Sequence, residues 1–137
     1  MRQNQPIFLD TGIFIAFLNG RDRWHTEAVQ LFGQSRLRWR TSYAIVSELY
    51  SWFLHRMGEE SARTGLRFLA ELEGLQIFGL DGDHHQAVLR MLGRLRGSKL
   101  TYADASSLCF IERHGINVVW STDMHLSLNG AQVLPRI

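Results

Sequence analysis

The sequence predicts an α/β domain whose mainly parallel sheet is covered by helices on both faces. Strand-like and helix-like segments alternate from one end of the chain to the other, which is the pattern of such domains. The first of them, Pro6–Leu9, is a short continuous apolar run, as expected for a buried strand. The length of 137 residues predicts one domain over residues 1–137.

The elements of the first third follow from local signals. After the strand at Pro6–Leu9, a helix is expected over Ile13–Asn19, where an Asn-Gly pair ends it. Asp22 is expected to cap a second helix that extends to about Gly33. Arg36–Thr41 alternates Arg with Leu and Trp, which is the period-two pattern of a strand.

The middle of the chain predicts two helices and a strand. Ser42 is expected to cap a long helix over Tyr43–Met57, which Gly58 ends. Glu59–Glu73 has leucines on one side and is expected to be the next helix, and Leu75–Phe78 is expected to be a strand. The last third repeats the alternation with a helix from Asp81 or Asp83 to about Leu95, a helix over Thr101–His114 that Gly115 ends, a strand at Asn117–Trp120 and a short strand at Gln132–Leu134.

The composition narrows the class of protein. Apolar residues make up 45% and charged residues 20%, which excludes a disordered chain. The only cysteine, Cys109, cannot form an internal disulfide, and neither a membrane span nor a signal peptide is recognisable, so we expect a cytoplasmic protein without membrane association. Of the 15 basic residues only Lys99 is not Arg, and arginine favours phosphate binding, although GC-rich coding would give the same bias.

Four carboxylates occupy unusual positions. Asp10 and Asp123 come just after apolar strands, at the sheet edge where parallel sheets bind ligands. Glu48 and Asp104 have mainly apolar or small neighbours three and four residues away, so we expect them on inward faces of helices. Taken singly, the strand-end acids could cap helices, and the helical acids could pair with arginines.

Taken together, the four acids indicate a metal site. Carboxylates gathered in one pocket repel one another unless a cation lies between them, and hard oxygen ligands select Mg²⁺ or Mn²⁺. Such an ion activates water and stabilises charge on a phosphodiester during cleavage. Thr11, Ser121 and Thr122 place hydroxyl groups at the same edge, where they could orient a ligand or cap a helix.

With these motifs in order, the chain resembles the PIN-domain nucleases, especially the VapC-like toxins of bacterial toxin–antitoxin pairs. The resemblance covers nearly the whole length, and its matching segments are 8–12, 41–42, 46–49, 100–105 and 121–126. It implies a three-layer α/β/α sandwich with a five-stranded parallel sheet of order 3-2-1-4-5. It also implies a Mg²⁺- or Mn²⁺-dependent endoribonuclease that hydrolyses RNA phosphodiester bonds.

The resemblance also suggests roles for individual residues. Asp10, Glu48, Asp104 and Asp123 match the four acidic positions that hold metal and carry catalysis, and Thr122 matches a common supporting hydroxyl. Thr11 is a further supporting candidate. His125 occupies a position that is often polar, and we do not assign it to catalysis.

The partners implied are an RNA substrate, a small antitoxin protein with a C-terminal helix, and a second copy of the chain in a homodimer. Aromatic residues of the first half, including Trp52 and Phe53, would mostly form core, with a surplus for an antitoxin groove. Some basic residues are expected to flank the acidic pocket and attract RNA, namely Arg21, Arg23, Arg36, Arg38, Arg40, Arg90, Arg94, Arg96 and Lys99.

Other functions are compatible with the pattern. A housekeeping RNA-processing nuclease would need the same four acids, and a non-catalytic RNA-binding domain could keep the same fold. A phosphotransfer receiver or a haloacid-dehalogenase-like phosphatase also places Asp at strand ends. Both would need residues that are missing here, because Asp10 is followed by Thr11-Gly12 and Lys99 is expected in a loop.

Overall fold

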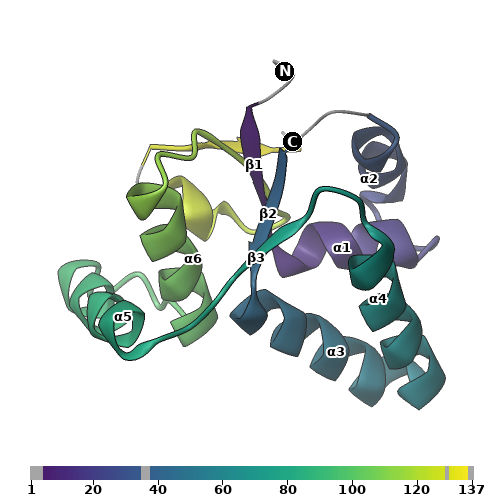
Figure 1. Cartoon of the computed structure of the whole chain (residues 1–137), viewed down its shortest axis with the longest axis horizontal. Helices are drawn as coiled ribbons and strands as arrows, with labels where there is room; N and C mark the ends of the chain where they lie inside the picture. Colours follow the sequence, from purple (N-terminus) through teal and green to yellow (C-terminus); the bar gives the residue numbers. More distant parts are fainter. Residues whose placement is uncertain (1–4, 35–37, 129, 136–137) are drawn as a thin grey trace.

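The computed structural model describes residues 5–34, 38–128 and 130–135. Its elements alternate as expected, with a parallel five-stranded sheet at the centre (Figure 1). The strands are β1 (Pro6–Leu9), β2 (Arg38–Ser42), β3 (Gln76–Phe78), β4 (Val118–Trp120) and β5 (Gln132–Leu134). Their order in the sheet is β3-β2-β1-β4-β5, which confirms the predicted order.

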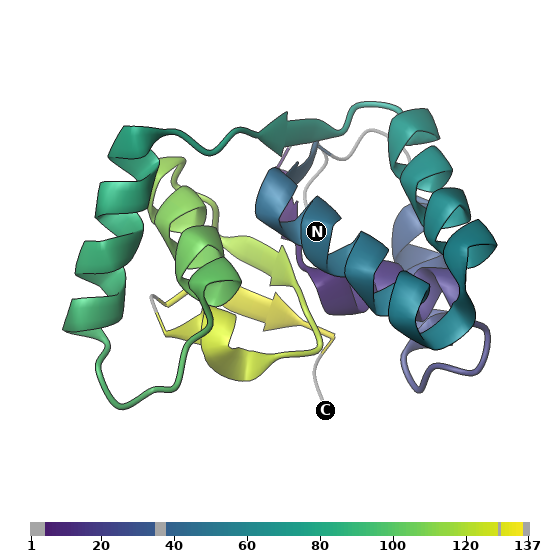
Figure 2. The same ribbon diagram turned by 90° about the horizontal axis from the view of Figure 1, so that it is seen from below.

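The helices form two groups on either side of the sheet. The first group contains α1 (Thr11–Leu18), α2 (His25–Phe32), α3 (Tyr43–Met57) and α4 (Glu59–Glu71). The second contains α5 (Gly82–Arg94) and α6 (Tyr102–Arg113). Figures 1 and 2 show the two groups on opposite sides of the central strands. After β3 the chain crosses to the other side of the sheet and forms α5 and α6 there. It then returns to the sheet as β4, next to β1.

The central strands are buried because helices cover both of their faces. Ile7, Phe8 and Leu9 of β1 and Val119 of β4 have no exposed surface. β1 pairs in parallel with β2 on one side and with β4 on the other, in a register that sets Leu9 opposite Trp120. The carboxyl ends of β1 and β4 therefore lie side by side, at the point where the strand order reverses.

The first helical group packs through an aromatic cluster. Phe32 contacts Phe14, Phe17, Trp39 and Phe68, with ring centroids 4.9–5.8 Å apart. These rings join α1, α2, α4 and β2, which explains why the first half of the chain is rich in aromatic residues. They belong to the core, as expected for most of them.

Several boundaries differ from the sequence predictions. The first helix begins at Thr11, two residues early, and the second begins at His25 because Asp22 closes a turn instead, accepting a hydrogen bond from Trp24 N at 2.8 Å. The predicted start of the second strand, Arg36, lies outside the described residues, and that strand continues to Ser42. A 3₁₀ helix, η1 (Met124–Ser127), was not predicted.

No helix in the described ranges is both long and apolar enough to cross a bilayer.

Candidate active site

The candidate site lies at the carboxyl ends of β1 and β4. Asp10 follows β1 directly, and its backbone N–H donates to Trp120 O at 3.0 Å, which extends the pairing of the two strands by one step. Ser121 and Asp123 follow β4. Ligands of open parallel sheets bind at such a reversal point, because the loops of neighbouring strands leave in opposite directions there.

Asp10 is the buried member of the site, with 7% of its surface exposed. The Ser121 hydroxyl donates to Asp10 Oδ2 at 2.6 Å and accepts from the backbone N–H of Asp123 at 2.9 Å, so it ties the two strand ends together. Burial raises the pKa of Asp10 to about 6, in spite of hydrogen bonds from Ser121 and Thr11 that favour the charged form. The nearby carboxylates of Glu48 and Asp104 act in the same direction as burial.

Asp104 enters the site from the first turn of α6. Its Oδ2 accepts from Thr101 N at 3.2 Å, and its own N–H donates to Thr101 Oγ1 at 3.0 Å. These two bonds form a capping box, which satisfies free N–H groups at the start of the helix and fixes the carboxyl orientation. Asp104 therefore caps α6 and lies in the site at the same time, whereas the capping alternative had been considered only for Asp10 and Asp123.

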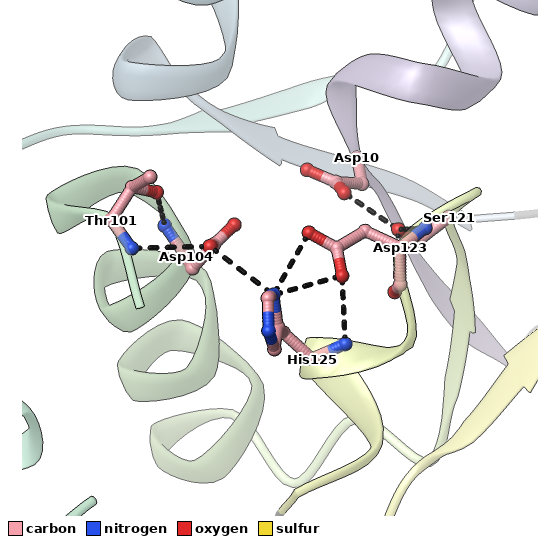
Figure 3. A network of polar contacts seen from close by, with 6 residues as sticks. All are labelled: Asp10, Thr101, Asp104, Ser121, Asp123 and His125. Atoms are coloured by element: carbon pink, nitrogen blue, oxygen red, sulfur yellow. Dashed lines mark hydrogen bonds and ion pairs between the residues drawn. The ribbon is translucent and has the colours of Figure 1, made fainter. Parts of the chain in front are cut away.

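Asp123 and His125 belong to the segment after β4 and line one side of the site. Asp123 caps η1 by accepting from His125 N at 2.9 Å. His125 Nδ1 lies 2.9 Å from Asp123 Oδ1 and 3.7 Å from Asp104 Oδ2, so this ring bridges two carboxylates. Figure 3 shows the carboxyl groups of Asp10, Asp104 and Asp123 directed toward a common space above the imidazole.

Glu48 completes the group from α3. Its Oε1 accepts from Thr11 Oγ1 at 2.7 Å, which connects the second turn of α3 to the start of α1. Partial desolvation raises the pKa of Glu48, and the charges of Asp104 and Asp123 add to this. Glu48 was expected on an inward face of its helix, and its side chain lines the cavity wall while remaining exposed.

All four acids line one cavity of about 660 Å³, with Thr11 and Thr122 also on its wall. Thr122 contacts the backbone at position 12 so closely that only glycine fits there. A Cβ on Gly12 would lie 2.0 Å from Thr122 Oγ1 and 3.1 Å from Thr122 Cβ. Thr122 is thus held against the start of α1, next to Asp10.

The donor set of the cavity fits a hard divalent cation. Ligand atoms of Asp104, Asp123 and His125 lie within 4.8 Å of one another, and Asp10 and Glu48 add carboxylate oxygens. The arginine ion pairs of the described residues join Arg63 to Glu59 and Arg94 to Glu112. Within the described part of the chain, pairing with arginine therefore accounts for none of the four acids.

Sequence reasoning missed part of the site. His125 was not assigned to it, and its role as a bridge depends on the unpredicted η1, which turns the ring back toward Asp104. The wall formed by α3 also carries Trp52, His55 and Arg56, which recur at four-residue steps after Glu48 and Ser51. That spacing was visible in the sequence. Arg90 and Arg94, expected to flank the acids, line a separate cavity.

Comparison with known proteins agrees with this architecture. The family model of the PIN domain matches residues 7–129. One solved structure with the same fold is VapC20 of Mycobacterium tuberculosis, described as a toxin that cleaves the sarcin-ricin loop. It is 22% identical with a TM-score of 0.83, and the match covers 91% of this chain and 95% of that chain.

Two further solved structures come from toxin–antitoxin complexes. VapBC2 of Rickettsia felis, bound to a DNA fragment of its promoter, is 11% identical with a TM-score of 0.70, covering 95% of this chain and 98% of that chain. VapBC-1 of Haemophilus influenzae is 16% identical with a TM-score of 0.66, covering 95% and 97%. No curated protein sequence matches the chain. The family model spans nearly all of the chain, and the strand order of the structure is the one that the resemblance implied. The protein therefore belongs to the PIN-domain family.

Proposed function

We propose that the protein is a divalent-metal-dependent endoribonuclease that hydrolyses RNA phosphodiester bonds. One observation carries the proposal: four carboxylates from four separate segments line a single cavity, and the arginine ion pairs of the described residues involve none of them. Gathering like charges in one cavity is unfavourable without a cation. The family match and the toxins that share the fold support a nuclease that requires such a cation.

In this proposal Asp10, Asp104 and Asp123 would hold Mg²⁺ or Mn²⁺, and Glu48 would either hold a second ion or orient the attacking water. Such an ion would supply a lower pKa for the water and a positive charge opposite the phosphate. Neighbouring hydrogen-bond donors position three of the acids. The Ser121 hydroxyl orients Asp10, the Thr11 hydroxyl holds Glu48 over the cavity, and the backbone N–H of Thr101 orients the Asp104 carboxylate. Thr122 Oγ1 is placed to bind a water or a phosphate oxygen.

We assign the biological role to a toxin–antitoxin pair in the cytoplasm. Support comes from the VapBC complexes that share the fold. The partner would be a small antitoxin with a C-terminal helix, and the toxin itself would form a homodimer. A small antitoxin reading frame directly upstream, whose product copurifies with the chain, is the expected result. A chain that is encoded alone and tolerated at high expression would instead support the housekeeping nuclease.

The activity is tested by RNA cleavage with purified protein in Mg²⁺ or Mn²⁺, compared with the same reaction in EDTA. Ribosomal RNA is a suitable first substrate. Asp104→Asn, which keeps an oxygen acceptor for the capping box, serves as the control for contaminating nucleases. Cleavage that requires both the metal and Asp104 is expected. Full activity of Asp104→Asn would contradict the assignment of the site, and no cleavage despite metal binding would favour a non-catalytic RNA-binding domain.

A further inference from the structure

The cavity extends beyond the carboxylates along α3. Glu48, Trp52 and Arg56 follow one another at four-residue intervals, so they lie on one face of the helix and all line the cavity. With a rise of 1.5 Å per residue, Trp52 and Arg56 lie about 6 Å and about 12 Å along α3 from Glu48. The acids and this pair therefore form two ends of one continuous wall.

The Trp52 side chain is held in a defined orientation. Its ring packs edge to face against Phe53, with centroids 5.0 Å apart, and Phe53 is itself 3% exposed. The Arg56 guanidinium lies over the Trp52 ring, 4.8 Å from the centroid. Trp52 remains partly exposed at the cavity, so a flat ligand could replace the guanidinium on this ring or stack beside it.

The end of the cavity formed by Trp52 and Arg56 carries a positive charge, opposite to that of the acids. Arg56 is the only Arg or Lys among the described residues that line the cavity. A polyanion is repelled by four carboxylates, so its approach needs a cation close to the site. An indole face stacks on a nucleobase, and a guanidinium pairs with a phosphate. An RNA strand likewise presents a base next to a phosphate, in the way that α3 presents Trp52 next to Arg56.

We propose that Trp52 and Arg56 form a subsite for one nucleotide of single-stranded RNA next to the scissile phosphate. Its base stacks on the Trp52 indole, and a phosphate adjoining this nucleotide pairs with the Arg56 guanidinium. The inference rests on the proposed ribonuclease function and extends it, because the acids then carry the chemistry while α3 holds the neighbouring nucleotide. Trp52 and Arg56 are recognition residues in this assignment, and the acids are unchanged by it.

A matched pair elsewhere on the molecule supplies the control. Arg23 lies over the ring of Trp24 at the same distance of 4.8 Å, in the segment before α2 and away from the cavity lining. Trp52→Leu and Arg56→Gln are compared with Trp24→Leu and Arg23→Gln. Trp52→Phe is the conservative variant, because it keeps a stacking face. Mn²⁺ binding and circular dichroism verify that each variant keeps its fold and its acidic site.

The test measures cleavage of short RNA and, in Mn²⁺, binding of oligonucleotides in which the scissile P–O bond is replaced by P–CH₂, which water cannot hydrolyse. Trp52→Leu is expected to raise KM and the dissociation constant about 10- to 100-fold with little change in kcat, while Trp52→Phe recovers most of the loss. Arg56→Gln is expected to weaken binding and to reduce the slope of log affinity against log salt by about 1. Trp24→Leu is expected to change neither quantity. Arg23→Gln removes an equal charge outside the acidic cavity, so it measures how much of the salt dependence an arginine away from that cavity contributes.

Replacing single nucleotides by abasic residues locates the stacked base. In the wild-type protein one position should lose about tenfold in affinity, and in Trp52→Leu this loss should disappear, which a purely structural role of Trp52 would not produce. Unchanged KM and unchanged affinity in Trp52→Leu would overturn the subsite while the nuclease stands, and weaker binding only to an antitoxin would assign the surface to protein. A wild-type protein that neither cleaves nor binds RNA would overturn both proposals.

Discussion

Two cavities of the described residues differ in how their charged side chains are arranged. The cavity at the ends of β1 and β4 gathers four carboxylates. A second cavity of about 270 Å³ lies between α5 and α6, and its charged lining mixes both signs, including Arg90, Arg94 and Glu112. There Arg94 Nη2 lies 3.0 Å from Glu112 Oε2, so opposite charges offset each other on the protein itself.

The two cavities differ in whether the protein itself supplies opposite charges for the acids that line them. In the second cavity the protein supplies both partners, and an exposed pair of this kind contributes little to stability. In the first cavity the carboxylates face one another, and burial holds the pKa of Asp10 well above its ordinary value. Without a cation the carboxylates of this cavity repel one another, which destabilises the folded state. A bound cation would remove this repulsion.

The largest effect is expected from neutralising Asp10. Asp10→Asn should lower RNA cleavage by more than about 100-fold, because residues that only support a metal ligand already cost 10- to 100-fold. The same variant should stabilise the metal-free protein by about 2–3 kcal/mol at pH 8, since it removes a buried charge. Activity and urea unfolding are measured on the same preparation. A variant that is both inactive and less stable than wild type would contradict the electrostatic interpretation.

The buried charge of Asp10 should also affect how the unfolding free energy depends on pH. The pKa of Asp10 is 3.8 ordinarily and about 6 in the folded protein, so the folded state holds the proton more tightly. The unfolding free energy of the metal-free protein should therefore fall, relative to Asp10→Asn, as the pH rises from about 4 to about 6, and stay level above that. The raised pKa of Glu48 acts in the same direction. A difference between the two proteins that grows toward low pH would refute this sign.

Addition of Mn²⁺ should reverse that loss at pH 8. A metal at 100 times its dissociation constant stabilises the protein that binds it by about 2.7 kcal/mol. We expect this gain in the wild-type protein and not in Asp10→Asn. Thermal unfolding with and without Mn²⁺ measures it, with Glu112→Gln in the second cavity as the control. A control that responds differently from wild type would show that the two cavities are coupled.

A smaller effect is expected from adding one methyl group at the rim of the acidic cavity. Gly12→Ala forces Thr122 to move, since the new Cβ would lie 2.0 Å from Thr122 Oγ1. Overpacking of this kind costs about 1–3 kcal/mol, and the better helix propensity of alanine in α1 offsets part of it. The double variant Gly12→Ala/Thr122→Ala should recover most of the stability. If the double variant is no more stable than Gly12→Ala, the steric clash of the added methyl group involves the backbone of α1 and not Thr122.

The smallest effect is expected from breaking the ion pair of the second cavity. Arg94→Gln and Glu112→Gln should each change the unfolding free energy by less than about 1 kcal/mol, because both side chains are more than half exposed. RNA cleavage should not change. Chemical denaturation and the cleavage assay of wild type serve as the reference. A large loss of activity in either variant would mean that this cavity takes part in RNA binding.

The regular elements were predictable from the sequence because local signals mark them. Ser42 caps α3, Asp81 caps α5 and Thr101 caps α6, as the residue types indicate. The strand order could not come from such signals, since it depends on which strands pair across the chain. It was expected on family resemblance, and the structure confirms it.

Two histidines show where local reasoning ends. His84 stands in no recognisable sequence motif, yet it is buried, stacks on Phe110 and contacts Ser106 Oγ at 2.8 Å. His125 was set aside, yet it bridges Asp104 and Asp123. Both contacts join residues from different elements, and spacing along the chain does not report them.

The pairing of β1 with β4 determines when the acidic cavity can exist during protein synthesis. Asp10 and its partner Ser121 are 111 residues apart in sequence, although their side chains are hydrogen-bonded. A nascent chain that ends after α5 carries Asp10 and Glu48 but not Asp104 or Asp123, and its sheet lacks β4 and β5. Under the proposed function, the ribosome therefore synthesises the chain beyond Asp123 before the chain can cut RNA.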